Sequence, residues 1–310
     1  MHAIYILFST FYRPEILGRI HTPVNIGIAT PPPMSETPFP QALDLDAYFA
    51  RIGYTGPRVA SLLVLNSIAL GHAQAIPFEN LDVISGRGVS LDMVSVQQKL
   101  IQSRRGGYCF EQNGLLLQVL LALGFQAQPI SARVRIGRTR EMTPPRTHLF
   151  VRVELEGASW LTDVGVGGLS ATAALRLELD VPQKTPHETR RIIHENGVYY
   201  HQALLGEGWT DVSEFTLEVM PPIDREVANW YTSMHPQSHF RDRLMVARAA
   251  SGGRRYTMLN NEFSVRDAEG KAVKRELHTK GELLAVLEEE FGLKLDPAVR
   301  FIVPELAGLA

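Results

Sequence analysis

The sequence predicts an α+β protein in which a helical bundle, an antiparallel sheet and a mixed unit follow one another along the chain. Residues 42–124 carry apolar residues at helical spacing, residues 125–228 consist of short β-rich runs, and residues 229–310 contain both patterns. The 310 residues, 45% of them hydrophobic, are enough for two or three packed units within one globule. The central segment is expected to form an antiparallel sheet that closes into a barrel.

The opening segment, residues 1–41, differs from the rest. It begins with the short apolar run "AIYILFSTFY" and reaches three consecutive prolines, Pro31–Pro33, just before Met34. It lacks the basic region and small-residue cleavage site of a signal peptide. We therefore interpret residues 1–41 as a disordered or non-native extension, with Met34 as the true start, rather than as a targeting segment or membrane tether.

Helix signals dominate residues 42–124. In "PRVASLLVLNSIALGHA", Pro57 precedes the expected helix start. The apolar residues at helical spacing there are Val59, Leu62, Leu63 and Leu70. In "SLDMVSVQQKLIQ", either Ser90 or Asp92 is suited to cap the helix N-terminus. A further helix follows Cys109, and Gly124 is placed to end it.

Strand signals begin after residue 124. Asn196-Gly197 separates two strand-like runs, which is a strong hairpin signal. In the last third, "RRYTMLNNEFSVRD" and "KAVKRELH" indicate strands around the turn "DAEG". A helix follows, and Thr279 and Glu282 have the spacing of a capping box.

Charge and cysteine content exclude several classes of protein. The formal net charge is −2 and no basic stripe is visible, so we expect no nucleic-acid partner. No apolar run approaches the roughly 20 residues that span a bilayer, so we expect no membrane partner. A single cysteine excludes an intrachain disulfide and favours the reducing cytoplasm.

That cysteine, Cys109, stands at the mouth of an apolar helix in "RRGGYCFEQNGLLLQVLLALG". The helix dipole at this position favours the thiolate, which is the nucleophilic form. The preceding "RGGY" allows a tight backbone turn and brings N–H groups near the sulfur, as an oxyanion site requires. The alternative is an inert buried cysteine that serves as a small apolar residue.

Cysteine catalysis needs a base and usually a group that orients it. His148 lies near a strand start in "RTHLFVRVEL", and Asp163 lies at a strand end in "WLTDVGVGG". Each residue alone is more typical of a structural role. Neighbouring strands would place both beside Cys109, so together they predict nucleophilic catalysis.

Five motifs in this chain resemble those of the arylamine N-acetyltransferases. They are "RGGYCFEQN" (active-site signature), "THLFVRV" and "LTDVGVG" (histidine and aspartate motifs), "PFENLDV" at residues 77–83 (first domain) and "NWYTSMHPQSHF" at residues 229–240 (third domain). The resemblance runs from about Leu43 to the C-terminus. It leaves residues 1 to about 40 without a counterpart.

The resemblance implies a helical bundle (42–124), a β-barrel (125–228) and an α/β lid (229–310) around a cysteine-protease-like catalytic core. It implies ping-pong transfer of acetyl from acetyl-CoA to an arylamine, hydrazine or arylhydroxylamine, as in xenobiotic metabolism. Cys109 would be the nucleophile, His148 its base, and Asp163 the group that holds the imidazole. Acetyl-CoA would be a co-substrate, with no bound cofactor or metal. We expect a monomer or homodimer with small-molecule partners only.

Further residues are assigned by the resemblance, and each also has an ordinary structural explanation. Those matching the acceptor pocket are Phe78, Val134, Val166 and Phe240, and those near the CoA channel are Thr147, Gly165 and Gly167. Arg105 and Glu79 match a structural salt bridge. The family commonly has Phe in "DVGFG" where this chain has Val166, so we expect tolerance of bulkier acceptors.

Three other interpretations remain open: a Cys-His-Asp thiol hydrolase or peptidase, an amide synthase of natural-product assembly, and a catalytically silent binding protein. A metal site at His235 and His239 is disfavoured because Pro236 interrupts the helix that would align them. Arg254-Arg255 indicates either an exposed turn or a contact to CoA phosphates.

Overall fold

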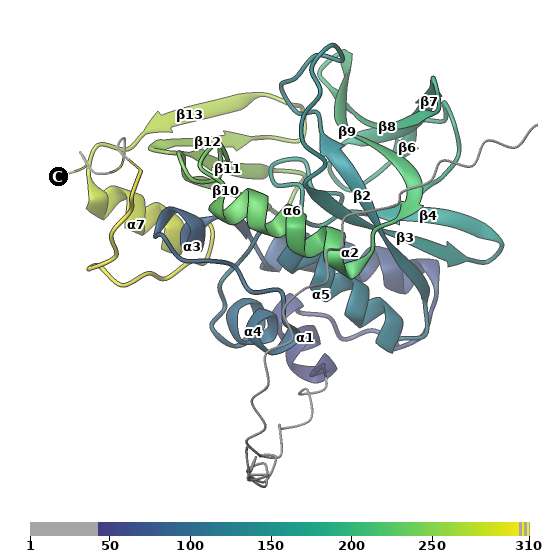
Figure 1. Cartoon of the computed structure of the whole chain (residues 1–310), viewed down its shortest axis with the longest axis horizontal. Helices are drawn as coiled ribbons and strands as arrows, with labels where there is room; N and C mark the ends of the chain where they lie inside the picture. Colours follow the sequence, from purple (N-terminus) through teal and green to yellow (C-terminus); the bar gives the residue numbers. More distant parts are fainter. Residues whose placement is uncertain (1–42, 304–305, 307–308, 310) are drawn as a thin grey trace, which may run out of the picture. The chain divides into compact units, whose positions relative to one another are not determined.

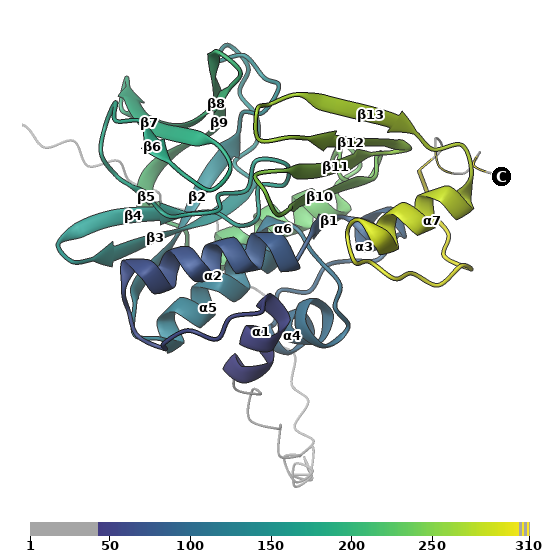
Figure 2. The same ribbon diagram turned by 180° about the vertical axis from the view of Figure 1, so that it is seen from behind.

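The structure, a computed structural model, describes residues 43–303, 306 and 309. Helices α1, α2, α4 and α5 lie together on one side of two antiparallel sheets (Figures 1 and 2). This arrangement confirms the predicted α+β class. The predicted extension, residues 1–41, lies outside the described residues.

The described residues form seven α-helices and one π-helical turn. The α-helices are α1 (Leu45–Ile52), α2 (Leu62–Ala75), α3 (Leu81–Ile84), α4 (Met93–Gln97), α5 (Cys109–Ala122), α6 (Pro222–Met234) and α7 (Lys280–Glu289), and the π-helical turn (Gln98–Gln102) continues α4. Two predicted caps are confirmed. Asp92 accepts the backbone N–H of Ser95 at the start of α4, and Thr279 and Glu282 form the capping box of α7.

The predicted start of α2 is wrong. The helix begins at Leu62, because the Ser61 side chain caps it by accepting the backbone N–H of Val64. The predicted apolar stripe is also misplaced, since the Leu63 side chain is 72% exposed and Val59 lies outside the helix. The residues that α2 buries are Val64, Leu65, Ile68, Ala69, His72 and Ala73.

The central segment forms an eight-stranded antiparallel sheet that curls into a nearly closed barrel. Its strand order is β5-β4-β3-β2-β9-β8-β7-β6. The strands are β2 (Gln126–Val134), β3 (His148–Leu155), β4 (Ala158–Thr162), β5 (Leu175–Arg176), β6 (Gln183–Lys184), β7 (Thr189–Glu195), β8 (Val198–Leu205) and β9 (Gly208–Val219). The Gln183 side chain bridges the two edge strands, because it donates to the carbonyl of Arg176 and accepts its N–H. The Asn196-Gly197 hairpin is confirmed, with positive φ at both residues.

The C-terminal third builds a second, five-stranded antiparallel sheet of order β1-β10-β11-β12-β13. Its strands are β1 (Phe78–Glu79), β10 (Met245–Ala249), β11 (Arg255–Leu259), β12 (Glu262–Arg266) and β13 (Ala272–Glu276). β1 comes from the N-terminal segment, where Phe78 pairs with Ala247. α6 extends across residue 228, where we predict the boundary between barrel and lid. The predicted domain boundaries stay predictions.

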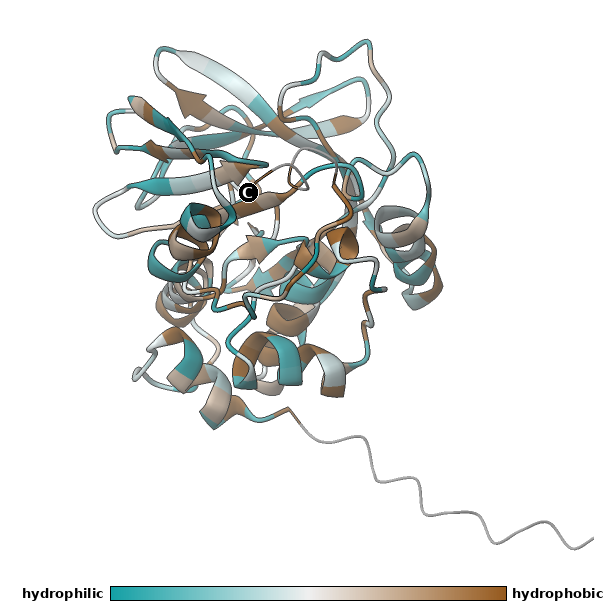
Figure 3. Ribbon diagram, turned by 90° about the vertical axis from the view of Figure 1, so that its left-hand side faces the viewer, coloured by the Kyte–Doolittle hydropathy of each residue, from teal (hydrophilic) through white to brown (hydrophobic). Residues whose placement is uncertain are grey.

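The two largest buried apolar clusters lie where the helices pack against the sheets. One buried apolar cluster joins the helices to β3, and a second lies between the five-stranded sheet, α3 and α7. Apolar and hydrophilic residues alternate along the helices and strands that enclose these clusters (Figure 3). None of the helices in the described part of the chain is both long and apolar enough to cross a membrane.

Two glycines before Cys109 allow the backbone to approach β1 closely. A Cβ on Gly106 would overlap the carbonyl oxygen of Pro77, and Gly107 exchanges backbone hydrogen bonds with Pro77 and Glu79. Neither glycine has a positive φ, and the left-handed residue of this segment is Arg104. The glycines are thus required by close packing, not by the tight turn that we expected from "RGGY".

We predict opposite effects for alanine at two nearby glycines. Gly106→Ala should lower the free energy of unfolding by at least about 2 kcal/mol, because the methyl group forces the backbone away from β1. Gly114→Ala should raise it by up to about 1 kcal/mol, because Gly114 lies inside α5 with open space around its Cα and alanine is the better helix former. Urea denaturation of both variants tests this. Equal effects would contradict it.

Candidate active site

Cys109 is the first residue of α5, so its side chain lies at the positive end of the helix dipole. The preceding Tyr108 donates its backbone N–H to Glu111 at 3.0 Å. The other carboxylate oxygen of Glu111 accepts a hydrogen bond from Nζ of Lys99 at 2.7 Å. Burial raises the pKa of Glu111 to about 7, although Lys99 opposes the shift. These contacts fix the end of α5 that carries the thiol.

The expected Arg105–Glu79 salt bridge supports the same region. Arg105 donates two hydrogen bonds to Oε1 of Glu79, from Nε at 3.0 Å and from Nη2 at 2.7 Å. Glu79 is fully buried, and its second oxygen accepts the backbone N–H of Leu81. The pair therefore connects the segment before Cys109 with β1 and α3.

His148 is the first residue of β3 and lies beside Cys109. Its Nε2 is 2.7 Å from Oδ2 of Asp163. The thiol of Cys109 contacts the carbonyl oxygen of Thr147, the residue before His148, at 3.6 Å. The structure thus brings Cys109, His148 and Asp163 together, with Asp163 paired to His148 and His148 beside Cys109.

Asp163 follows β4 and is almost completely buried. Besides His148, its carboxylate accepts Nδ2 of Asn113 at 2.9 Å and the backbone N–H of Gly165 at 3.1 Å. Burial alone would raise the pKa of Asp163, but the charge of His148 and these hydrogen bonds hold it below the ordinary value. Asp163 therefore stays ionised behind the imidazole.

The pKa of His148 shifts in the opposite direction. Burial alone would lower it, but the charge and hydrogen bond of Asp163, aided by Cys109, raise it well above its usual value. An imidazole that keeps its proton can pair with a thiolate and later give that proton to a leaving group.

Asn113 is a site residue that sequence reasoning missed. Its Nδ2 donates to Asp163 and to the carbonyl of Leu149, and its Oδ1 accepts the backbone N–H of Val164 at 3.0 Å. Asn113 thereby holds β3 and the segment after β4 against α5. Its position four residues after Cys109, on the same helix face, is the signal that could have found it.

A cavity of about 360 Å³ opens at Cys109. It is lined by nine of the ten predicted site residues: Cys109, His148, Phe78, Val134, Val166, Phe240, Thr147, Gly165 and Gly167. Asp163, the tenth, lies behind His148. The lining residues that sequence reasoning missed are Ile136, Arg138, Pro145, Gly168, His239, Met245, Val246, Thr257, Met258 and Leu259. The walls are mainly apolar and aromatic, which suits a flat ring.

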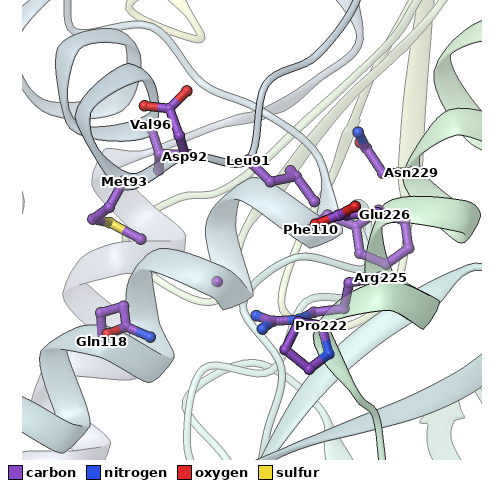
Figure 4. Close-up of a pocket in the computed structure, with 11 residues that line it drawn as sticks. Leu91, Asp92, Met93, Val96, Phe110, Gln118, Pro222, Arg225, Glu226 and Asn229 are labelled. Atoms are coloured by element: carbon purple, nitrogen blue, oxygen red, sulfur yellow. The ribbon is translucent and has the colours of Figure 1, made fainter. Parts of the chain in front are cut away.

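A second cavity, of about 500 Å³, lies between α4, α5 and α6 (Figure 4). Figure 4 shows Gln118 on α5 and Arg225 on α6 among its lining residues. None of the ten predicted site residues lines it. The chemistry of Cys109 therefore belongs to the first cavity.

The interpretation of Arg254-Arg255 as an exposed turn or a CoA contact is wrong for Arg255. Arg254 is exposed and follows a turn, but the guanidinium of Arg255 is buried and paired with Glu188. His235 ends α6 and its neighbour Pro236 lies outside the helix. Within residues 43–303, 306 and 309, no group of three His, Cys, Asp or Glu side chains is placed to hold a metal ion.

Comparison with known proteins identifies the class. A family model described as N-acetyltransferase matches residues 61–300. The arylamine N-acetyltransferase of Escherichia coli K12 is 39% identical over 264 residues, which is 85% of this chain and 94% of that protein. The arylamine N-acetyltransferase structure from M. smegmatis superposes with a TM-score of 0.80 at 36% identity, covering 86% of this chain and 99% of that one. The Mycobacterium marinum enzyme in complex with CoA gives a TM-score of 0.77 at 34% identity, covering 80% and 92%.

These relatives and the fold place the chain among the acyltransferases. More specifically, it belongs to the arylamine N-acetyltransferase family.

The pKa shift of His148 predicts how stability depends on pH. We compare Cys109→Ser with the double variant Cys109→Ser/Asp163→Asn, so that the thiol is absent from both. With Asp163 present, the stabilisation from His148 is complete below the unfolded-state pKa of about 6.5 and is lost as pH rises. Without Asp163, the buried imidazole binds its proton poorly, so stability falls as pH drops below about 6.5.

The difference in free energy of unfolding between these two variants should therefore widen from pH 9 to pH 5, by up to about 1.4 kcal/mol per pH unit. Urea denaturation at each pH measures it. A difference that stays constant, or that grows with rising pH, would show that the carboxylate does not hold the imidazole's proton.

Proposed function

We propose that this chain transfers an acetyl group from acetyl-CoA to arylamines, arylhydrazines or arylhydroxylamines through an acetyl-Cys109 intermediate. The observation that carries the proposal is the buried His148–Asp163 pair beside Cys109 at the end of an apolar cavity. Membership of the arylamine N-acetyltransferase family supports the acceptor class. A family structure that contains CoA supports the donor.

In the first half-reaction, the Cys109 thiolate attacks the thioester carbonyl of acetyl-CoA. The new bond joins Sγ to the acetyl carbon, and the bond between that carbon and the CoA sulfur breaks. His148 gives its proton to the departing thiolate, so CoA leaves as a thiol. The exchange is nearly isoenergetic, because one thioester replaces another.

In the second half-reaction, the neutral nitrogen of the acceptor attacks the acetyl-cysteine. The nitrogen's proton passes to His148, the C–S bond breaks, and Cys109 returns as a thiolate. Arylamines are weak bases, so the nitrogen is unprotonated and nucleophilic at neutral pH. Two half-reactions at one sulfur give ping-pong kinetics.

The remaining residues have positioning and binding roles in this proposal. Asp163 orients the imidazole and Asn113 holds Asp163 in place. Phe78, Val134, Val166 and Phe240 enclose the aryl ring, and Thr147, Gly165 and Gly167 contact the CoA arm near the thiol. A mechanism that needs a free thiol suits the reducing cytoplasm, which stays the expected location.

An intact mass of the purified protein mixed with acetyl-CoA alone tests the mechanism. We expect a single acetyl adduct that is absent in Cys109→Ser and that disappears when an aniline or hydrazine is added. Steady release of acetate without an adduct would favour a thiol hydrolase. No adduct and no turnover would favour a different acyl donor, as an amide synthase uses, or a silent scaffold.

Val166 gives a second prediction. The side chain is buried in the cavity wall, where it packs in a cluster with Leu169 and Val212. Val166→Phe should narrow the cavity and lower kcat/KM for para-substituted anilines more than for aniline, which serves as the internal control. A series of anilines with growing substituents measures this, and the same ranking in both proteins would exclude a role of Val166 in acceptor choice.

A further inference from the structure

The cavity wall next to Cys109 is a loop, residues 163–171, which we call the wall loop. Its inner side presents Gly165, Val166 and Gly167 to the cavity. The loop is closed on itself, because the backbone N–H of Ala171 donates to the carbonyl of Asp163 at 2.6 Å. The Ser170 hydroxyl also accepts the N–H of Gly167 at 3.1 Å.

Two buried arginines hold the outer side of the wall loop. Arg190 on β7, 0% exposed, donates to the carbonyl of Leu169 at 2.7 Å. Arg255 on β11, 2% exposed, donates to the carbonyl of Ser170 at 2.9 Å. β7 and β11 belong to different sheets, which Figure 2 shows on either side of the loop region.

One carboxylate, Glu188, joins the two arginines. Its carboxylate accepts hydrogen bonds from Nε of Arg255 at 2.6 Å and from Nη2 of Arg255 at 2.7 Å. It also accepts a hydrogen bond from Nη2 of Arg190 at 3.0 Å. Burial alone would raise the pKa of Glu188, but the arginines hold it well below its usual range, so the carboxylate stays charged. Buried ion pairs add little net stability compared with apolar packing, but their forked hydrogen bonds fix distances and directions.

A second part of the cavity wall, formed by β11, is attached to the same group of residues. Thr257, Met258 and Leu259 line the cavity from β11, the strand that carries Arg255. The two walls are already in close contact, since a Cβ on Gly168 would lie 3.0 Å from Cγ2 of Thr257. Glu188 and its two arginines therefore determine how the wall loop sits against β11.

One end of the wall loop, Asp163 and Val164, has a further support, and this support holds the reacting groups. Asn113 on α5 holds Asp163 and Val164, and the imidazole is held by Asp163. A change at Glu188 would thus move the wall between Val166 and Ser170 more than the thiol and its base.

We propose that Glu188, Arg190 and Arg255 form a buried clamp that sets the width of the acceptor cavity and so selects acceptors by size. These are positioning residues, since they act through the wall loop and do not touch substrate. The inference rests on the proposed acetyl transfer at Cys109.

The test compares kcat/KM for aniline and for 4-butylaniline in wild type and Glu188→Gln. In a ping-pong reaction, kcat/KM for the acceptor depends only on the second half-reaction, so effects on acetyl-CoA cancel. We expect kcat/KM for aniline to fall about tenfold and that for 4-butylaniline to change less than about twofold, because the added butyl group fills a widened cavity. A merely structural role would lower both values equally by reducing the folded fraction.

Arg266→Gln is the matched control. Arg266 reaches the same carboxylate at 2.7 Å but is partly exposed and its guanidinium does not hold the wall loop. In Arg266→Gln, the ratio of kcat/KM for aniline to kcat/KM for 4-butylaniline should stay at the wild-type value. If Glu188→Gln fails to fold, Arg255→Lys takes its place as the test. This variant keeps the positive charge but loses the guanidinium group that donates to the carbonyl of Ser170. It should shift the kcat/KM ratio in the same direction.

An unchanged ratio in Glu188→Gln, or in Arg255→Lys where that variant decides, would overturn the clamp while leaving the proposed function intact. An equal shift of the kcat/KM ratio in Arg266→Gln and Glu188→Gln would also overturn it, because the effect would then not act through the wall loop. Absence of acetyl transfer by the wild-type protein would instead reject the proposed function, and the clamp with it.

Discussion

The burial of the Asp163 carboxylate is the constraint on which the site depends. A charge removed from water is tolerated only when donors surround it, and here they come from three directions: the imidazole of His148, the amide of Asn113 and the backbone of Gly165. Satisfying this one group brings a strand, a helix and a loop together. The loop then comes so close to α5 that Gly165 must lack a side chain, because a Cβ there would lie 2.8 Å from Cα of Cys109.

A second charged network keeps the helix end still. Lys99 contacts both Asp82 and Glu111 at 2.7 Å, and Arg105 extends the network to Glu79. The network joins the π-helical turn, α3 and β1 to the first turn of α5, which carries Cys109. The cavity at Cys109 itself is lined mainly by apolar residues.

Local signals in the sequence were sufficient wherever local chemistry decides the outcome. The Thr279 capping box and the Asn196-Gly197 hairpin each depend on only a few neighbouring residues. The order of the motifs was enough to predict that Cys109, His148 and Asp163 lie together. Burial of charged residues could not be predicted in this way. The pair Arg254-Arg255 follows two glycines in the sequence and suggests an exposed turn, but Arg255 is buried against Glu188, which is 67 residues away. The buried face of α2 was also difficult to predict, because residues 62–65 are four apolar residues in a row and their periodicity alone does not show which of them is exposed.

The pairing of β1 with β10 has a consequence for synthesis of the protein. Phe78, one wall of the cavity, is held by a strand around Ala247, and Asn80 donates to the carbonyls of Phe240 and Arg243. On the ribosome, a chain that already contains Cys109, His148 and Asp163 therefore still has an open cavity. The cavity is completed only when residues near 247 emerge, so Cys109 is synthesised well before the cavity beside it can be enclosed.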